Sequence, residues 1–547
     1  MAVKPNIVLI LADDLGFADI GCYGSEIQTP HLDRLAERGL RFSQMYNSAR
    51  CCPSRAALLT GLHPHQAGIG WMTYPIPDAD DAHQGYLNEH CVTIAEVLKP
   101  AGYHTIMSGK WHIGNWYEAQ QRETWTPGVP GWPIPTQRGF DSFYGTLDGA
   151  GSFFNPHMLM SQEELIRPAS PDFYYTDAIA DNAVERIGAA LDTDAPFFAY
   201  VAFTAPHWPL HALEEDVAKY EVTYRCGWDA IRTARHEQQK GMGLIDRRWE
   251  ISPRDPDSWP FEESRYREWE AMRMAVYAAQ VDRMDQGIGR IVKLLEGRGA
   301  LGDTLIFFLS DNGGCAEFLK EDTDAPEPDR YNMPTVDGRP MRVGNLPHLT
   351  PGGADTFMSY DLPWANVSNT PFRRYKSWVH EGGIATPLVV HWPARIEDPG
   401  LVHTPIHIID IMPTCVEVSG AEYPGEYKGQ PIQPMEGESF LAALTKPAWH
   451  RERPIWFEHE GNCALRDGAW KLVKRHPERW ELYNIDEDRT ELNDLAAQDG
   501  PRLAAMIDRW NKEARRVGVA DLGWLHDRIA ENHKRNWNAV EERFRSS

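Results

Sequence analysis

The sequence has 547 residues, of which 42% are hydrophobic, and its formal net charge at pH 7 is −24. A chain of this length can bury a large core and form roughly two to four domains. The acidic balance argues against general binding to nucleic acid or to anionic membranes, which both need basic surface. No apolar run approaches the length of about 18 residues that a membrane-spanning helix requires.

The first apolar run, Asn6–Ala12, follows directly on Met1–Lys4. It is too short for a secretory signal, is followed by no small-residue cleavage site, and ends at Asp13 and Asp14. We therefore interpret it as a buried strand, and we expect the protein to be cytoplasmic.

Four short apolar runs each end abruptly in a polar cluster, which predicts strands that are buried on both faces. The runs are Asn6–Ala12, Tyr103–Met107, Phe197–Phe203 and Thr304–Leu309. Helical patterns lie between them: three are expected to begin at Thr29-Pro30, Thr93 and Thr176, and a long one covers about Tyr266–Leu295. This alternation predicts an α/β fold with a largely parallel sheet between two layers of helices. Ligands of such sheets bind beyond the carboxyl ends of the strands, where the polar clusters lie.

The pattern changes at about residue 450. Short strands are predicted at Pro454–Glu458, Cys463–Leu465 and Trp470–Lys474, with a hairpin turn at Asp467-Gly468, and an amphipathic helix follows near Leu503–Ala514. We therefore predict a catalytic domain at 1–450 and a C-terminal subdomain at 451–547, with a small antiparallel sheet, a helix and a charged tail. The tail is either an oligomer contact or a loose end.

Three long segments, 115–172, 208–262 and 316–375, look irregular and are expected to form the walls of a substrate pocket. Trp71, Trp116, Trp132 and Trp208 suggest an apolar or sugar-stacking pocket, although such residues more often pack in cores or loops.

The eight cysteines form no CxxC pair and no short-spaced framework, so the sequence predicts neither a zinc site nor a disulfide scaffold. The adjacent pair Cys51-Cys52 is followed by Pro53-Ser54-Arg55 and, after one more turn, by Gly61. Pro53 suits the first turn of a helix and Gly61 its end, which puts Cys51 at the helix N-terminus. Free N–H groups there favour an anion and lower the pKa of a thiol. The alternative is a pair of buried, inert thiols.

Cys51-x-Pro53-Ser54-Arg55, followed by Leu59-Thr60-Gly61, resembles the signature of the type I sulfatases. Further blocks are similar to those of the same family, from about residue 4 to 497: Ala12–Asp19, Gly109–Gly114, Ser310–Gly313, Lys376, Glu381–Ile384, Glu481–Asn484 and Glu491–Leu495. Ala385 departs from the pattern, because many relatives have Arg there. The resemblance implies an alkaline-phosphatase-like fold with a large mixed sheet. It also implies that a formylglycine-generating enzyme oxidises Cys51 to formylglycine, with Cys52 in the variable position.

Asp13, Asp14, Asp311 and Asn312 follow two of the predicted strands and offer only oxygen ligands. Such a set suits a hard cation, Ca²⁺ or Mg²⁺, and the resemblance implies one Ca²⁺. The alternative, that Asp13-Asp14 only caps a turn, does not explain two acidic pairs in matching positions. Related phosphonate and phosphodiester hydrolases tend to have His at the position of Asn312 and to use a transition metal.

Five further residues complete the predicted site: Arg55, Lys110, His112, His207 and Lys376. The resemblance implies that a hydrated aldehyde at position 51 attacks sulfur and that His112 then assists release of sulfate as a base. It implies that His207 and Lys376 bind sulfate and supply a proton to the leaving oxygen, and that Lys110 and Arg55 hold position 51 and the metal ligands. His211 and His380 are competing candidates that we rank lower.

The predicted function is hydrolysis of aryl or carbohydrate sulfate esters. The runner-up is a phosphonate monoester or phosphodiester hydrolase on the same scaffold, and a third possibility is a non-catalytic anion-binding protein. The expected partners are a small sulfate ester and the maturation enzyme. A homo-oligomer stays open, and neither nucleic acid nor membrane is expected.

Overall fold

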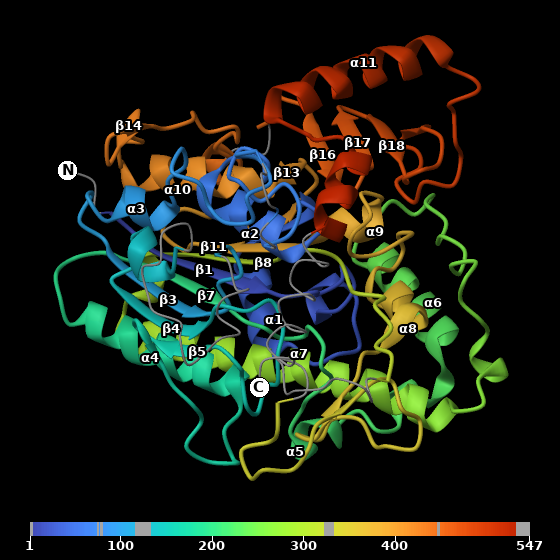
Figure 1. Ribbon diagram of the computed structural model, residues 1–547, viewed down its shortest axis with the longest axis horizontal. Helices are drawn as coiled ribbons and strands as arrows, with labels where there is room; N and C mark the ends of the chain where they lie inside the picture. Colours follow the sequence, from blue (N-terminus) through green and yellow to red (C-terminus); the bar gives the residue numbers. More distant parts are fainter. Residues whose placement is uncertain are drawn as a thin grey trace.

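The computed structural model describes residues 4–73, 76, 80–114, 133–321, 333–445 and 449–531. Within these residues the centre of the molecule is a sheet of eleven strands (Figure 1). Ten of them lie in the order β12 (Gly400–Val402), β2 (Leu40–Tyr46), β11 (Ala385–His391), β8 (Thr304–Ser310), β1 (Asn6–Ala12), β7 (Phe197–Ala202), β3 (His104–Gly109), β4 (Ser142–Thr146), β5 (Leu159–Ser161) and β6 (Glu164–Leu165), and β13 (Ile406–His407) pairs with β2.

The sheet is mixed but mostly parallel. β1 runs parallel to both of its neighbours, β7 and β8, whereas β11 runs antiparallel to β2 and β8. β5 and β6 are antiparallel additions at one edge. The α/β architecture predicted from the strand and helix patterns is confirmed.

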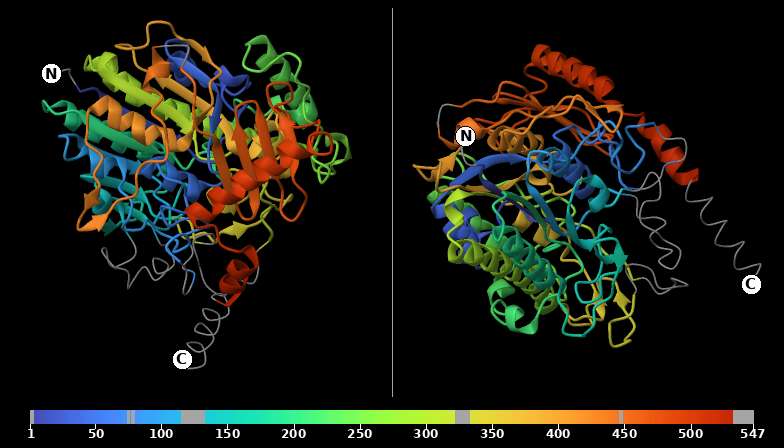
Figure 2. Two further views of the ribbon diagram at one scale, coloured as in Figure 1. Left: turned by 90° about the horizontal axis from the view of Figure 1, so that it is seen from above. Right: turned by 90° about the vertical axis from the view of Figure 1, so that its left-hand side faces the viewer.

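Helices cover both faces of the sheet because its central strands are apolar on both sides (Figures 1 and 2). In β1, Val8 and Ile10 belong to one hydrophobic core and Ile7 and Leu9 to the other. The first core is closed by α1 (Pro30–Glu37), α4 (Tyr175–Leu191) and α7 (Arg267–Gly297). The second is closed by α2 (Cys51–Thr60), α3 (Ile94–Leu98) and α10 (Ile411–Ser419).

The predicted helix starts are partly right. Thr93 and Glu96 form a capping box at the start of α3, and Thr29 precedes α1. The prediction for Thr176 was wrong: α4 begins at Tyr175, its N-cap is Tyr174, and Thr176 lies buried inside the first turn. Tyr175 is buried, and its hydroxyl donates to Thr146 at 3.2 Å. These contacts hold Tyr175 in the helix, so the first turn of α4 begins before Thr176, the expected cap residue.

The segments expected to be irregular contain regular elements. The largest is α6 (Trp228–Gly241) within 208–262, and α8 (Asp361–Ser368) lies within 316–375. The buried face of α6 contains charged side chains, such as Arg235, which pairs with Asp19 at 2.7 Å. The sequence of α6 therefore shows no apolar stripe from which a helix could be predicted. Residues 115–132 of the segment 115–172, which include Trp116 and Trp132, lie outside the described residues.

The C-terminal part forms a four-stranded antiparallel sheet made of β16 (Ile455–His459), β17 (Asn462–Asp467), β18 (Trp470–Lys474) and β19 (Glu481–Asn484). One face of this sheet packs on the main core and the other on α11 (Gly500–Val517), the outermost layer in Figure 2. Gly468, with φ of 59°, makes the predicted turn between β17 and β18. The boundary between residues 450 and 451 stays a prediction.

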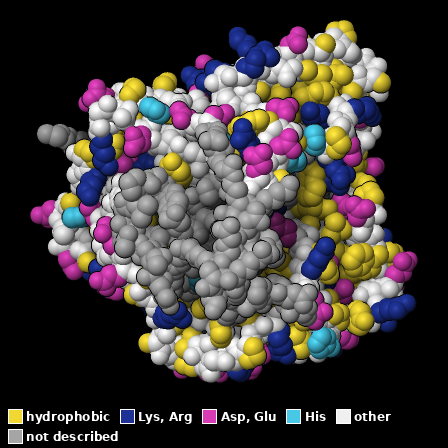
Figure 3. All heavy atoms as spheres, viewed as in Figure 1, with side chains coloured by type: hydrophobic (Ala, Val, Ile, Leu, Met, Phe, Trp, Pro, Cys, Tyr) yellow, Lys and Arg dark blue, Asp and Glu magenta, His cyan; other side chains and the backbone are white. Residues whose placement is uncertain are grey.

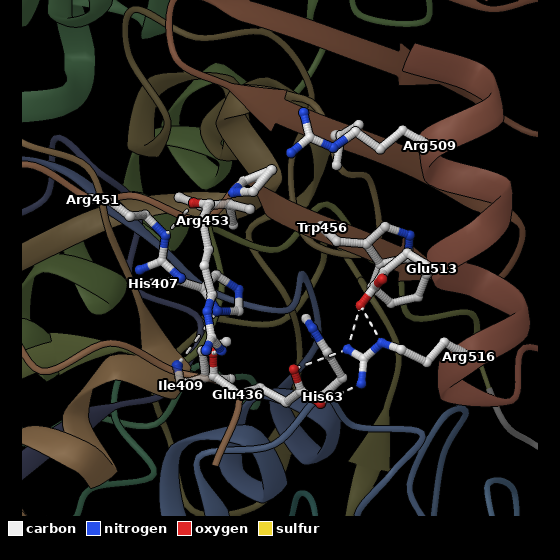
Figure 4. A pocket seen from close by; sticks show the side chains of 13 residues that line it. His63, His407, Ile409, Glu436, Arg451, Arg453, Trp456, Arg509, Glu513 and Arg516 are labelled. Carbon is white, nitrogen blue, oxygen red and sulfur yellow. Dashed lines mark hydrogen bonds and ion pairs between the residues drawn. The ribbon is translucent and has the colours of Figure 1, made fainter. Parts of the chain in front are cut away.

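Buried ion pairs join the two parts. The carboxylate of Glu381, directly before β11, accepts from Lys471 at 2.8 Å and from Arg489 at 2.7 Å. Elsewhere along the junction, a cavity of about 290 Å³ lies beside Trp456, where Arg516 of α11 contacts Glu436 and His63 follows α2 (Figure 4). The C-terminal sheet is therefore held to the catalytic part by charge as well as by apolar packing.

Acidic and basic side chains are interspersed on the face drawn in Figure 3, so the net negative charge forms no single patch on the part of that face that is described. Among the described residues, no helix has both the length and the apolar character needed to cross a bilayer.

Candidate active site

The four predicted metal ligands meet where β1 and β8 end. The two strands pair in parallel with Ala12 beside Ser310, so the residues that follow each strand are neighbours. Asp14 N donates to Asp311 Oδ1 at 3.2 Å, and Asn312 Nδ2 donates to Asp14 Oδ1 at 2.6 Å. Asp13, Asp14, Asp311 and Asn312 are all buried.

Two oxygens of this cluster fit a hard cation. Asp13 Oδ1 and Asn312 Oδ1 are buried and have no hydrogen-bond partner in the described part of the chain. Burial, followed by the nearby charge of Asp311, raises the pKa of Asp13 to about 7. A buried acceptor without a donor is costly, and a cation bound by both oxygens would remove that cost and stabilise the carboxylates. The donor set therefore suits the Ca²⁺ expected from the sequence.

Cys51 is the first residue of α2, as its sequence context predicts. Arg50 precedes it in an extended conformation, and the helix ends at Gly61 with φ of 68°. Cys51 is 2% exposed, at the floor of the site. A hydrogen bond from the Cys52 thiol, helped by the charge of Lys110, keeps the pKa of Cys51 well below its usual value. The environment of position 51 thus favours negative charge.

Arg55 and Lys110 neutralise the carboxylates under Cys51. Arg55 Nε donates to Asp311 Oδ2 at 3.0 Å, and its Nη1 donates to the Lys110 carbonyl oxygen at 2.9 Å. The Lys110 ammonium pairs with Asp13 Oδ2. Both cations are fully buried, so each is fixed by these contacts.

Lys376 and His207 form a second group on the other side of Asp14. Lys376 Nζ lies 2.9 Å from Asp14 Oδ2 and 3.2 Å from His207 Nε2. Burial alone would lower the pKa of Lys376, but Asp14 raises it well above its usual value, whereas burial lowers the pKa of His207. His207 Nδ1 is 2.5 Å from the Trp208 carbonyl oxygen, which can only accept, so the proton lies on Nδ1 and Nε2 accepts from Lys376.

His112 reaches Cys51 from the loop after β3. Its φ is 54°, and burial lowers its pKa to about 3, so the ring is neutral. Its Nδ1 has no hydrogen-bond partner among the described residues. The ring lies against Gly149, where a Cβ would come within 2.4 Å of it. Glycine at position 149 therefore makes room for the imidazole.

The structure brings all predicted site residues together and adds others. Glu317 accepts from Trp208 Nε1 at 2.8 Å and pairs with Arg50 at 3.0 Å. Lys376 and Arg50 overcome the effect of burial and lower the pKa of Glu317. No motif marked Glu317, although it lies in a segment that was expected to border the pocket. No motif marked Gly149 either, although it lies within 115–172, another segment that was expected to border the pocket.

The two competing histidines lie elsewhere. His211 Nδ1 accepts from the backbone of Phe153 at 3.2 Å, and its Nε2 contacts the carbonyl oxygen of Thr356. His380 Nε2 lies 3.4 Å from Glu481 of the C-terminal sheet. Both are used to connect segments of the fold.

Comparisons with known proteins agree with this arrangement. The family model described as Sulfatase matches residues 5–421, and the model described as N-sulphoglucosamine sulphohydrolase, C-terminal, matches residues 373–516. An arylsulfatase of Klebsiella aerogenes is 32% identical, with 82% of this chain and 94% of that protein covered. An uncharacterized sulfatase of Schizosaccharomyces pombe is 30% identical, with 97% and 96% covered.

Among solved structures, Ps i-CgsB in complex with k-i-k-neocarrahexaose superposes with a TM-score of 0.64 at 26% identity, covering 94% of this chain and 93% of that one. The chain belongs to the sulfatase family, whose enzymes hydrolyse sulfuric esters on an alkaline-phosphatase-like fold. The phosphonate monoester hydrolase of Agrobacterium radiobacter, with a TM-score of 0.57 at 18% identity, shares the fold alone.

Proposed function

We propose that this protein hydrolyses sulfate esters to an alcohol or phenol and inorganic sulfate, with formylglycine at position 51 and one Ca²⁺ held by Asp13, Asp14, Asp311 and Asn312. The observation that carries the proposal is the position of Cys51 at the start of α2, facing Lys110, His112 and Lys376. Cations and a neutral base around one buried atom suit transfer of an anionic group to that atom.

Two groups absent from the bare chain would supply part of the chemistry. When formed at position 51, formylglycine offers a hydrated aldehyde as the nucleophile toward sulfur. When bound, Ca²⁺ would withdraw electron density from a sulfate oxygen and offset the three converging carboxylates.

Side chains of this protein would bind the sulfate, transfer the protons and hold the metal site. Lys376 Nζ carries a proton 3.2 Å from His207 Nε2, so this pair can bind a sulfate oxygen and donate a proton to the leaving oxygen as the S–O bond breaks. Neutral His112 can accept a proton from a hydroxyl at position 51, which promotes release of sulfate. Arg55 and Lys110 fix Asp311 and Asp13, and through them the metal site.

The first experiment is mass spectrometry of the peptide that contains residue 51. Conversion of cysteine to formylglycine lowers its mass by roughly 18 Da, the change from thiol to aldehyde. We expect this change in active protein from the native host. An unmodified Cys51 in fully active protein would refute the proposed nucleophile.

The second experiment separates the two hydrolase classes. Turnover of p-nitrophenyl sulfate is compared with that of the matching phosphonate and phosphodiester, each with Ca²⁺ and with Mn²⁺. We expect sulfate turnover to dominate and Ca²⁺ to support it. Weak sulfate turnover beside strong phosphonate turnover would instead favour the phosphonate hydrolase, the alternative for which the shared fold is the only support.

A further inference from the structure

A cavity of about 410 Å³ opens beside the N-terminus of α2, one residue from Cys51. It is lined by Arg50, Trp71, Met72, Glu460, His526, Ile529 and Ala530. Arg50 directly precedes Cys51, and Met72 Sδ lies 3.6 Å from the sulfur of Cys52. Its volume is in the range of small-molecule pockets, roughly 300–1,000 Å³.

Most of the walls are apolar and come from two distant parts of the chain. Trp71 and Met72 follow α2, whereas Ile529 and Ala530 belong to the helical residues 522–531 near the C-terminus. The rings of Trp71 and His526 meet edge to face at 5.7 Å, so the two walls are in contact. The opposite side of Trp71 is supported by the ring of His459 at 6.2 Å.

Both terminal nitrogens of Arg50, the basic group of the cavity, already have partners. Arg50 donates to Ser377 Oγ at 2.6 Å and pairs with Glu317 at 3.0 Å. Glu460 lies 3.5 Å from His459 Nε2. A polyhydroxylated ring would lose hydrogen bonds to water here and recover few of them, because the terminal nitrogens of Arg50 are engaged and most of the lining is apolar. An apolar ring would exclude water from Trp71 and Met72 without such a loss.

The cavity is also connected to the groups that face the leaving oxygen. Glu317 joins Arg50, on the cavity wall, to Trp208, whose ring contacts that of His207 at 4.5 Å. Because Arg50, on the cavity wall, directly precedes Cys51, the ring of a substrate whose sulfate lies at position 51 would be within reach of the cavity.

We infer that this cavity binds the alcohol part of the substrate and that the preferred alcohol carries an apolar ring and is not a sugar. The inference rests on the proposed sulfatase function. Trp71 and Ile529 are the specificity-determining residues, and the C-terminal helical residues 522–531 form one wall of the substrate site.

The test compares two esters with the same primary C–O–S linkage, cyclohexylmethyl sulfate and glucose 6-sulfate, so that leaving-group reactivity is matched. We expect the full-length enzyme to show a kcat/KM about 10-fold or more in favour of the apolar ester, a typical value for discrimination by an apolar pocket. Trp71→Ala and Ile529→Asp should each remove most of that preference through KM. Asp527→Ala, which changes an exposed neighbour outside the cavity, should keep it.

Equal kcat/KM for the two esters in the unaltered enzyme would overturn the inference. So would Trp71→Ala and Ile529→Asp variants that lower both esters by the same factor, since that result would mean a purely structural role. Turnover of p-nitrophenyl sulfate is measured in the same preparation. If that ester is also not hydrolysed by protein with formylglycine at position 51, the proposed function itself fails, and the assignment of the cavity fails with it.

Discussion

Lys376 Nζ lies 2.9 Å from Asp14 Oδ2, although the two residues are 362 positions apart in the sequence. Both are buried, and the pair is in contact with His207. Asp14 neutralises the Lys376 ammonium, and the imidazole of His207 is neutral. The proton between the two side chains therefore lies on Lys376 Nζ and points toward His207 Nε2. This contact places the proposed proton donor beside the proposed metal site.

Cys51 and Cys52 are adjacent, and the Cys52 thiol donates a hydrogen bond to the sulfur of Cys51. We expect Cys51→Ala to abolish sulfate ester turnover, because no nucleophile can form at position 51. Cys52→Ala should keep activity within about 10-fold, since the proposed nucleophile forms at position 51 and Cys52 supplies no bond to it in the reaction. The measurement is kcat with p-nitrophenyl sulfate. Equal loss in both variants would make the choice of Cys51 unsafe.

Gly149 gives a test of the position of His112. Gly149→Ala would place a Cβ 2.4 Å from the imidazole, so the ring must move. We expect kcat to fall about 100-fold, as for a displacement of a catalytic group by about 1 Å, with little change in melting temperature. Gly151→Ala is the matched control, because its nearest neighbouring atom would be 3.9 Å away. A fully active Gly149→Ala enzyme would contradict the role of His112.

The unpartnered oxygens of Asp13 and Asn312 predict that Ca²⁺ stabilises the folded protein. At a Ca²⁺ concentration 100 times the dissociation constant, the free energy of unfolding should rise by about 2.7 kcal/mol. Removal with a chelator should reverse the rise and stop turnover. Asn312→Ala should shift the Ca²⁺ dependence of the melting temperature to higher concentrations. The same titration curve in the variant would exclude Asn312 as a ligand.

The pKa of the Glu381 carboxyl predicts how the stability of the junction between the two parts of the chain changes at acid pH. Burial alone would raise the pKa of Glu381, but Lys471 and Arg489 lower it from 4.5 to about 2. The folded-state pKa is below the unfolded one, so this stabilisation is complete above about pH 4.5 and is lost as the pH falls through about 2. Unfolding measured by circular dichroism across this range should show the loss.

Glu381→Gln should remove that acid-dependent part and lower the stability at neutral pH by about 3 kcal/mol, because two buried cations lose a partner. Asp467→Asn, which breaks the exposed pair with Arg509, should cost less than about 1 kcal/mol. Similar losses in the two variants would show that the buried cluster has no special part in joining the C-terminal sheet.

The local sequence determined the chemistry-bearing segments. Apolar runs that end in Asp13-Asp14 and Ser310-Asp311-Asn312 predicted strands, and parallel strands bring their carboxyl ends to one edge, so these ligands had to meet. Cys51 before Pro53 and Gly61 likewise predicted a short helix with Cys51 at its start. These inferences depend on neighbours a few residues apart.

Only the tertiary structure decided the rest. Thr176 was mistaken for a cap because burial of Tyr175 moved the start of α4, and α6 was missed because its buried face contains charged residues such as Arg235. Glu317 and Gly149 carry no local pattern, since their roles come from contacts with Arg50 and His112 that the packing of distant segments creates. Ile529 likewise carries none, because it lines one cavity with Trp71 only in the folded chain. Contacts of that kind have no period or spacing in the sequence, and the folded chain alone defines them.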